Sequence, residues 1–252
     1  MAELSSYDGV PLADLEARSG SPRIVAFDTV GSTMDVAHEL AREGAAHGTV
    51  VLAAEQTAGR GRERRGWQSA AGGVWLTLVA REVDSRNLGV LPLRIGMAAA
   101  EALEAFTSEP IGLKWPNDLY LRAGKLGGVL VEALWRGRQL DWAAVGIGIN
   151  LTAPDGVGAA GLGESVRRAD AVARLVPALL AAAAHSGALT MAELRAFAAR
   201  DIARGREISA PIAGVVAGID ESGALLVESG DTITPVRSGS LTFRRSTAVP
   251  FR

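Results

Sequence analysis

The residues best suited to chemistry lie in one stretch, residues 56–78, which reads QTAGRGRERRGWQSAAGGVWLTL. Arg60, Arg62, Arg64 and Arg65 fall within six residues of it and are interleaved with glycines. A planar guanidinium group binds carboxylate or phosphate through two parallel hydrogen bonds. Four arginines on one flexible turn repel one another unless an anion lies among them. The stretch therefore predicts a loop that binds an anionic ligand, and a solvated surface turn is the alternative.

Two lysines provide a second signal. Lys114 stands in LKWPND, inside an otherwise apolar segment where an unpaired ammonium group would be costly. Lys125 lies between Gly124 and the pair Gly127 and Gly128, and glycines in a strand let a ligand or another backbone come close. One lysine alone would be typical of a solvated strand end. Together with the arginines, the two ammonium groups are suited to stabilise negative charge on a phosphate, so we predict a phosphate-containing ligand.

Asn117 and Asp118 follow Pro116 and have two interpretations. They are ordinary turn residues after a proline, or they bind the ligand. In the second case Asp118 would hold Mg²⁺ and Asn117 would hydrogen-bond a base.

Patterns of several other activities are missing. The sequence has no G-x-x-x-x-G-K-[ST] phosphate loop and no G-x-S-x-G nucleophile elbow, and GIGIN at residues 146–150 lacks the third glycine of a dinucleotide site. His38, His47 and His185 do not have the spacing of metal ligands, and we expect each at the surface of a helix or loop.

The composition limits the class of protein. The 252 residues carry 26 Lys and Arg against 28 Asp and Glu, so the formal net charge is −2, unlike the basic excess of a general nucleic-acid binder. The absence of cysteine excludes disulfides, thiolate metal sites and a cysteine nucleophile. The first 20 residues do not resemble a signal peptide, and no uncharged apolar run reaches about 18 residues. We expect a cytoplasmic protein without a membrane partner.

The elements that position these residues follow from the hydrophobic pattern. Residues 32–44 predict a helix that begins at Ser32 or Thr33 and ends at Gly44. Pro116 excludes a single helix over residues 111–121, and Pro177 should kink or split its helix. The remaining predictions are strands at residues 23–27, 49–55, 73–82, 124–137 and 139–151, helices at 91–106, 168–185 and 190–203, and a glycine-rich loop at 152–165.

The sequence pattern changes near Gly205, after which short β segments alternate with turns at residues 220–223 and 230–231. We therefore expect an α+β fold of two domains. Residues 1–204 would form a mixed β-sheet flanked by helices and carrying the catalytic site, and residues 205–252 would form a small β-barrel.

At this point the motifs resemble a known family. GRGRERRGW resembles the G-R-G-R-x-G-R-x-W loop of biotin protein ligases, and KWPNDL, GKLGGVLVE and GIGINL are similar to further signatures of that family in the same order and spacing. STMDVA is similar to its S-T-N-x-x-A segment, and the terminal barrel resembles its SH3-like domain. The resemblance covers about residues 21–250. It implies the class II synthetase-like fold of biotin and lipoyl ligases.

The resemblance also implies a two-step reaction. Biotin and MgATP give biotinyl-5′-adenylate and pyrophosphate, and the biotinyl group then passes to one lysine of a biotin carboxyl carrier domain. The arginine loop would fold over biotin and the adenylate phosphate and exclude water, which would hydrolyse the mixed anhydride.

Individual residues receive roles from the same resemblance. Those expected at biotin are Ser32, Thr33 and Gln56 at the ureido ring, Gly59 and Arg60 through their backbone, Arg62 and Lys125 at the carboxylate, and Gly127, Gly128 and Gly148, which leave room for the ligand. Those expected at the nucleotide are Arg65, Trp67, Lys114, Asn117 and Asn150, with Asp118 near Mg²⁺. Lys125, Arg62 and Arg65 would be catalytic. The alternatives are a plain helix cap for Ser32 and Thr33, core packing for Trp67 and a buried strand end for GIGIN.

Three features qualify the resemblance. Arg64 replaces a glycine of the loop pattern, and Met34 replaces the asparagine of S-T-N-x-x-A. Only about 20 residues precede the first predicted strand, too few for the helix-turn-helix that lets some members repress biotin genes. We therefore expect a monofunctional ligase, a monomer or weak homodimer, that does not bind operator DNA.

Two other functions remain as alternatives. A lipoate or fatty-acid ligase of the same superfamily would use a similar fold, although octanoyl transfer there resembles a cysteine reaction and this chain has no cysteine. A non-catalytic module that binds single-stranded nucleic acid or a peptide would use the arginine loop and the barrel, but the loop lacks interleaved aromatic residues.

Overall fold

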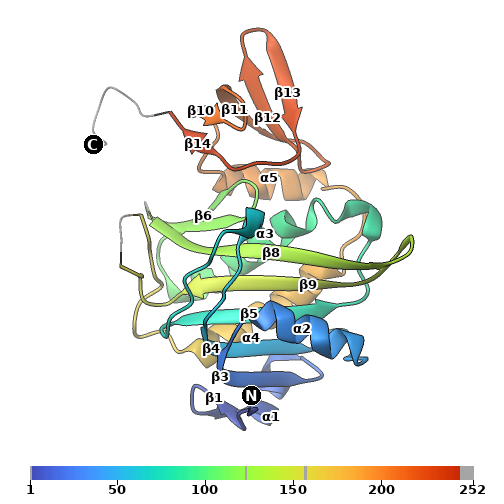
Figure 1. Cartoon of the computed structure of the whole chain (residues 1–252). Coiled ribbons are helices and arrows are strands. Elements are labelled where there is room, and N and C mark those ends of the chain that lie inside the picture. The colour runs from blue at the N-terminus through green and yellow to red at the C-terminus, as the bar shows by residue number, and fades with distance from the viewer. Residues whose placement is uncertain (1, 123, 156–157, 245–252) are drawn as a thin grey trace.

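The computed structural model describes residues 2–122, 124–155 and 158–244, without the side chains of Arg64 and Asn87. Its centre is a seven-stranded sheet in the order β3-β4-β5-β9-β8-β7-β6 (Figure 1). Strands β3 and β4 are parallel and every other neighbouring pair is antiparallel, so the sheet is mixed as predicted. The strands are β3 (Ile24–Val30), β4 (Val50–Gln56), β5 (Gly73–Ala80), β6 (Ile111–Lys114), β7 (Asp118–Leu121), β8 (Gly124–Arg136) and β9 (Gln139–Asn150).

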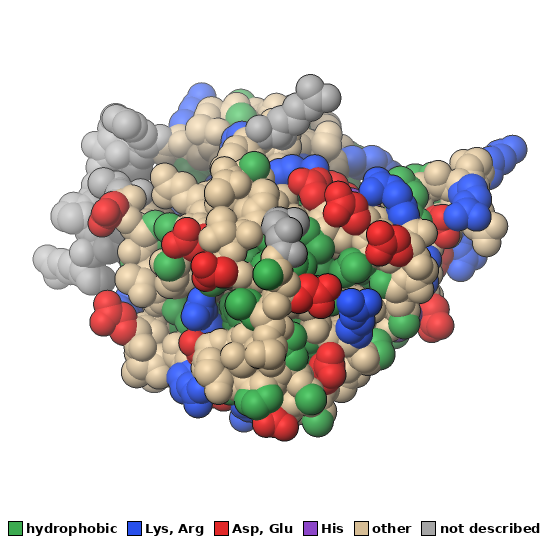
Figure 2. Space-filling model, turned by 60° about the horizontal axis from the view of Figure 1, so that its bottom comes forward, with side chains coloured by type: hydrophobic (Ala, Val, Ile, Leu, Met, Phe, Trp, Pro, Cys, Tyr) green, Lys and Arg blue, Asp and Glu red, His purple; other side chains and the backbone are tan. Residues whose placement is uncertain are grey.

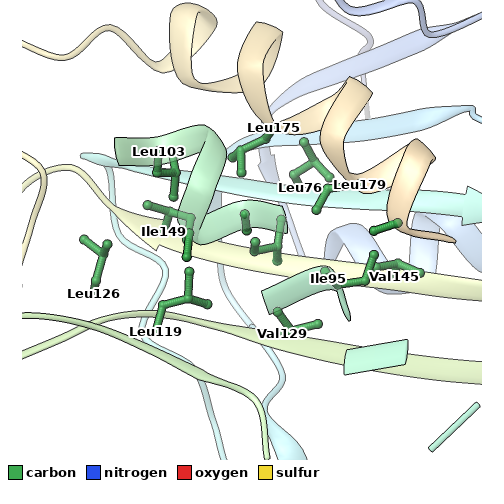
Figure 3. Close-up of a cluster of buried hydrophobic side chains, with 14 of the residues drawn as sticks. Leu76, Ile95, Leu103, Leu119, Leu126, Val129, Val145, Ile149, Leu175 and Leu179 are labelled. Carbon is green, nitrogen blue, oxygen red and sulfur yellow. The ribbon is translucent and has the colours of Figure 1, made fainter. Parts of the chain in front are cut away.

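Helices cover both faces of this sheet. Helix α2 (Thr33–Arg42) lies on one face, and α3 (Leu91–Leu103) and α4 (Arg168–Ala183) lie on the other (Figure 1). Successive strand residues point to opposite faces. Val51 and Ala53 accordingly pack with α2, whereas Val50 and Leu52 pack with α3 and α4. Figure 3 shows the second of these clusters, where Leu175 and Leu179 of α4 meet Leu76 of β5.

The expected beginning and end of α2 are confirmed. The Ser32 side chain accepts a hydrogen bond from the Met34 amide at 3.3 Å, which caps the first turn. Gly44 has φ +95°, a conformation that glycine adopts without strain. The cap places Thr33 at the carboxyl end of β3, facing the sheet.

A tight turn at residues 115–117 joins the two shortest strands of the sheet. The Trp115–Pro116 bond is cis, and the register sets Lys114 opposite Asp118. Asp118 lies opposite Gly128, and Gly128 lies opposite Gly148. Lys114, Asp118 and the two glycines therefore form one row across four strands.

The short β segments predicted after residue 205 form a five-stranded antiparallel sheet, which we call the small domain. Its strands are β10 (Glu207–Ala210), β11 (Gly214–Ile219), β12 (Leu225–Ser229), β13 (Thr232–Val236) and β14 (Thr242–Phe243), in the order β13-β12-β11-β10-β14. The Trp115 indole N–H donates to the carbonyl of Gly223 at 2.9 Å and joins this sheet to the large domain. Helix α5 (Met191–Arg200) lies between the two sheets (Figure 1).

Three predictions about local structure were wrong or incomplete. Helix α4 runs through Pro177 without splitting, because its buried residues Val172, Leu175, Val176 and Leu179 pack against the sheet. His38 is buried and not at the surface, since it lies on the inner face of α2. The sequence reading missed the segment before β3, which forms the hairpin β1 (Ser6–Tyr7) and β2 (Val10–Pro11) and helix α1 (Leu12–Ser19).

Short 3-10 turns complete the described chain at η1 (Arg62–Arg64), η2 (Ser85–Asn87) and η3 (Glu104–Phe106). No helix in the described ranges combines the length and apolar character needed to cross a membrane. Acidic and basic side chains are interspersed on the face shown in Figure 2, which therefore lacks the continuous basic surface typical of nucleic-acid binding.

Candidate active site

A cavity of about 610 Å³ opens over the row of Lys114, Asp118, Gly128 and Gly148, which we call the glycine row of the sheet. Its walls are the arginine loop, which we define as residues 57–72 between β4 and β5, and residues 240–242 of the small domain. A volume of this size suits a small organic ligand. Most of the residues predicted from the sequence line it: Ser32, Thr33, Gln56, Arg60, Arg62, Arg65, Trp67, Lys114, Asn117, Asp118, Lys125, Gly128, Gly148 and Asn150.

Two predicted glycines, Gly59 and Gly127, are not among the lining residues. A Cβ on Gly59 would overlap the Trp67 carbonyl oxygen at 2.6 Å, and a Cβ on Gly127 would overlap the Ile149 side chain at 2.6 Å. Both glycines therefore allow neighbouring chain segments to pack. Gly128 differs, because the atom nearest to its added Cβ would be the Asp118 Oδ1, at 3.5 Å. At Gly128 the sheet face is open toward the cavity.

One end of the cavity presents neutral hydrogen-bonding groups. The Gln56 Oε1 accepts from the Thr33 amide at 2.8 Å and from the Thr33 hydroxyl at 3.1 Å. The hydroxyls of Thr33 and Thr77 are 2.8 Å apart, and the Gln56 side-chain amide donates to Ser69 Oγ at 2.8 Å. Since the Thr33 proton is directed to Gln56, the Thr77 hydroxyl donates to Thr33. The chain of hydrogen bonds fixes the orientation of Thr33 and Gln56 before any ligand arrives.

Met34 closes the floor of this end. Its side chain is buried, and its Cε would lie 2.7 Å from a Cβ added to Gly146. The departure from the family's asparagine thus supplies an apolar thioether in place of an amide. Thr77, Ser69 and Met34 were not predicted as site residues. The hydroxyl of Thr77 in an otherwise apolar strand was the available signal.

The other end of the cavity is cationic. Its lining includes Arg60, Arg62, Arg65, Lys114 and Lys125, against the carboxylates of Asp118 and Asp155. Burial lowers the pKa of both Arg62 and Lys114 from their ordinary values, because it penalises the charged form. A bound anion would offset that penalty. The excess of positive charge therefore suits a phosphate group.

Lys125 lines this end beside an acidic and an aromatic side chain. Its Nζ lies 2.6 Å from the Asp118 Oδ1 and 4.8 Å from the centroid of the Trp67 ring. The Trp67 indole N–H is buried and has no hydrogen-bond partner in the described chain. Such an orphan donor is costly, and a ligand acceptor in the cavity would satisfy it. Trp67 is therefore a wall of the cavity as well as a packing residue.

The arginine loop is a folded ribbon. Arg60 pairs with Gly66 as an isolated antiparallel bridge, and the amides of Gly61 and Trp67 donate to Arg65 and Gly59, each at 2.8 Å. Glu63 at its tip has φ +57°, a left-handed conformation uncommon for a side-chain-bearing residue. The effect of arginine at position 64 lies outside the described side chains.

Two arginines tie the loop to the small domain. The Arg62 Nη1 donates to the Gly239 carbonyl at 3.2 Å and to Asn117 Oδ1 at 3.5 Å. The Arg65 Nη2 donates to Ser240 Oγ and to Glu63. Residues 239–240 were not predicted at the site, because they are more than 170 positions from Arg62 and Arg65 and carry no local signal. The small domain therefore forms part of the cavity wall.

Asn117 and Asn150 already use their amide groups within the protein. The Asn117 Nδ2 donates to the Val129 carbonyl at 2.7 Å, and the Asn150 Nδ2 donates to Ala160 at 3.2 Å. These bonds hold the β6–β7 turn and the loop after β9. Recognition of adenine by either residue stays a prediction.

The described residues contain no cluster of three or more His, Cys, Asp or Glu side chains that could hold a metal ion. Asp118 is one carboxylate, and one of its oxygens faces Lys125. Mg²⁺ bound with nucleotides takes one or two protein carboxylates and fills its coordination from phosphates and water. The second oxygen of Asp118 fits that limited role.

Comparisons with known proteins agree with this geometry. A family model described as the biotin/lipoate A/B protein ligase family matches residues 26–150. The bifunctional ligase/repressor BirA of Bacillus spizizenii is 37% identical over 126 residues, which cover 49% of this chain and 39% of that protein. The biotin–[acetyl-CoA-carboxylase] ligase of Paracoccus denitrificans is 33% identical over 198 residues, 70% of this chain and 82% of that protein. Among solved structures, biotin protein ligase from Aquifex aeolicus in complex with biotin and ATP has a TM-score of 0.75 and 28% identity, covering 89% of this chain and 100% of that one.

Proposed function

This chain belongs to the family of ATP-dependent biotin protein ligases, and from that membership we propose that it activates biotin as biotinyl-5′-adenylate and transfers the biotinyl group to a lysine of a biotin carboxyl carrier domain. The observation that carries the proposal is the two-ended cavity. Neutral hydrogen-bonding groups line one end and cationic groups line the other. The cavity between them runs over the glycine row, where Gly128 and Gly148 have no side chains to fill it. An acid with a polar ring and a carboxylate tail matches both ends.

The first step joins the carboxylate to the α-phosphate. A biotin carboxylate oxygen attacks the α-phosphorus, the bond to the β-phosphate oxygen breaks and pyrophosphate leaves. We assign Lys125 to the oxygens that gain negative charge, because it lines the cavity with its Nζ beside Asp118 and the Trp67 ring. Mg²⁺, when bound near Asp118, would neutralise phosphate charge. Arg62 and Arg65 would hold the adenylate under the loop, which keeps water away from the mixed anhydride.

The second step transfers the acyl group. The neutral amine of the carrier lysine attacks the biotinyl carbonyl carbon, AMP leaves with the electron pair of the C–O bond, and the amine loses one proton as the amide forms. The arginine loop must hold the adenylate until the carrier arrives, because release to water hydrolyses it. The contacts of Arg62 and Arg65 with residues 239–240 support this retention role.

The neutral end of the cavity favours biotin over lipoate. The ureido group of biotin offers two N–H donors and a carbonyl acceptor, which can pair with Thr33 and Gln56. The dithiolane ring of lipoate has no N–H donor and no carbonyl acceptor for these groups, so a site of this kind discriminates against it.

We also propose that this chain does not bind operator DNA. The described residues ahead of β3, 2–23, form the β1–β2 hairpin and helix α1, which packs beside α4, and contain no helix-turn-helix. An electrophoretic shift with biotin-operon operator DNA, in the presence of biotin and ATP, would test this. A specific shifted band would contradict it.

The experiment that tests the ligase proposal is ATP–pyrophosphate exchange with biotin, lipoate, octanoate or no acid. Exchange that needs biotin, followed by label transfer to a carrier domain, is the expected result. Exchange with lipoate alone would keep the chemistry and replace the substrate. No exchange with any acid, in folded protein, would mean that the motifs serve a binding module.

A further inference from the structure

His38 is a buried histidine with defined partners on both ring nitrogens. It lies on α2, 9% exposed, and the Trp142 indole Nε1 donates to its Nδ1 at 2.9 Å. An indole N–H can only donate, so Nδ1 carries no proton and Nε2 carries one. The Nε2–H then donates to Glu132 Oε2 at 3.1 Å. Trp142 thereby fixes the tautomer of His38, and His38 orients the carboxylate of Glu132.

The same carboxylate faces the arginine loop. The Arg60 Nη2 lies 3.4 Å from Glu132 Oε2 and 2.8 Å from Asp35 Oδ1. Glu132 comes from β8, Asp35 from α2 and Trp142 from β9. Two elements of the large domain, β8 and α2, therefore contact one side chain of the loop, and β9 supports them through the hydrogen bond from Trp142 to His38.

Arg60 stands at the base of the loop ribbon. Its backbone forms the bridge with Gly66, and its side chain is one of the cations that line the cavity. Holding its guanidinium on Glu132 and Asp35 fixes the direction in which its backbone faces the ligand. Partly exposed ion pairs contribute little to overall stability. The value of these contacts lies in the orientation of the loop.

We propose that His38 and Glu132, aligned by Trp142, are positioning residues that hold the arginine loop in its ligand-binding shape through Arg60. The identity of the ligand rests on the proposed function, but the positioning itself does not. The competing explanation is that His38 only satisfies the Trp142 donor inside the core. The two explanations differ in what happens at the loop.

Kinetic measurements on three variants test the proposal. Glu132→Gln and His38→Leu should raise the KM for biotin about tenfold and leave kcat for adenylation within about twofold, because they loosen binding and spare the reacting groups. His38→Gln should keep the wild-type KM, since its side-chain N–H can still reach Glu132. Glu43→Gln, an exposed charge change at the end of α2, is the control and should change neither value. A fall in kcat with unchanged KM would overturn the proposal.

A double-mutant cycle asks whether the effect passes through Arg60. Glu132→Gln should add nothing to Arg60→Ala, whereas additive effects would show that the two residues act separately and would refute the positioning role.

A ligand-free readout separates failure of this proposal from failure of the ligase proposal. The amides of Gly61 and Trp67, which close the loop ribbon, should exchange hydrogen about tenfold faster in Glu132→Gln and His38→Leu than in wild type or Glu43→Gln. Unchanged exchange would overturn the positioning role even in an active enzyme. Faster exchange would support it even if wild-type protein failed to use biotin.

Discussion

Replacing Lys125 with alanine removes the group that we place at the centre of the reaction. The Nζ of Lys125 lies 2.6 Å from Asp118 Oδ1, and about a third of its side chain is exposed. The substitution deletes the ammonium group from the cationic end of the cavity. It leaves Thr33 and Gln56 at the neutral end untouched.

The expected magnitude follows from these contacts. Loss of one donor aimed at developing negative charge slows reactions by about 10²–10³-fold, or about 2.7–4 kcal/mol. A partly exposed ion pair contributes only about 1 kcal/mol or less to folding. We therefore expect adenylation to slow by about 10²-fold or more, while the free energy of unfolding changes little and biotin binding persists.

Single-turnover formation of labelled adenylate measures the rate, and calorimetric titration with biotin measures binding. Arg138→Ala, an exposed charge deletion in the turn between β8 and β9, serves as the control and should behave as wild type. An adenylation rate for Lys125→Ala within about threefold of wild type would refute the role that we assign to this ammonium group.

Three further predictions concern the glycines, the loop and an ion pair. Gly128→Ala should fold normally, since its Cβ meets only ordinary contacts, and should raise the KM for biotin. Gly127→Ala should lower the free energy of unfolding by about 1–3 kcal/mol, because its Cβ would overlap the Gly148 carbonyl oxygen. Equal Tm values for the two variants would contradict this difference. Arg62→Ala should release the adenylate about tenfold faster in a filter assay, because one of two guanidinium clamps is lost, and unchanged release would count against it. Burial raises the pKa of Glu193, but hydrogen bonds from Arg94 and the helix cap outweigh it and hold the pKa at about 2. Because the folded pKa is depressed, the ionised carboxylate stabilises the folded state at pH values above the unfolded pKa of 4.5. The free energy of unfolding should therefore fall by about 2–3 kcal/mol between pH 4.5 and 2 in the wild-type protein, and Glu193→Gln should lack this fall.

The sequence predicted the central parts of the site because each belongs to a short continuous motif. The cap at Ser32, the arginine loop, the turn at Pro116 and the glycines of β8 and β9 all have local physical signatures. Strand register then brings Lys114, Asp118, Gly128 and Gly148 into one row, as motifs on neighbouring strands must. The mixed sheet and the small terminal sheet were predicted from the change in the period of the hydrophobic pattern.

Long-range contacts were not predictable in the same way. Nothing local marks residues 239–240 as partners of Arg62 and Arg65, because the contact depends on how two domains pack. The effect of Pro177 on helix α4 was overestimated, because packing of the buried face of α4 contributes more to the stability of the helix than local propensity does. His38 could have been predicted: Met34, Ala37 and Ala41 have the spacing of one buried helix face, and His38 falls among them.

The distribution of lysine in this chain suits the chemistry that we propose. Lysine occurs only at positions 114 and 125, and both lysines line the cavity. Arginine is used instead of lysine everywhere else in the chain. An acyl-adenylate acylates neutral amines, but a guanidinium stays protonated and is not attacked. Lys125 is paired with Asp118, whereas burial lowers the pKa of Lys114, which makes loss of a proton from that amine less costly. Without a carrier domain, we expect self-biotinylation of lysine side chains to be confined to Lys114. Mass spectrometry after incubation with biotin and ATP should locate it there, and Lys114→Arg should abolish it. Biotin on Lys125 in the wild-type protein would show that the ion pair with Asp118 does not restrain that amine.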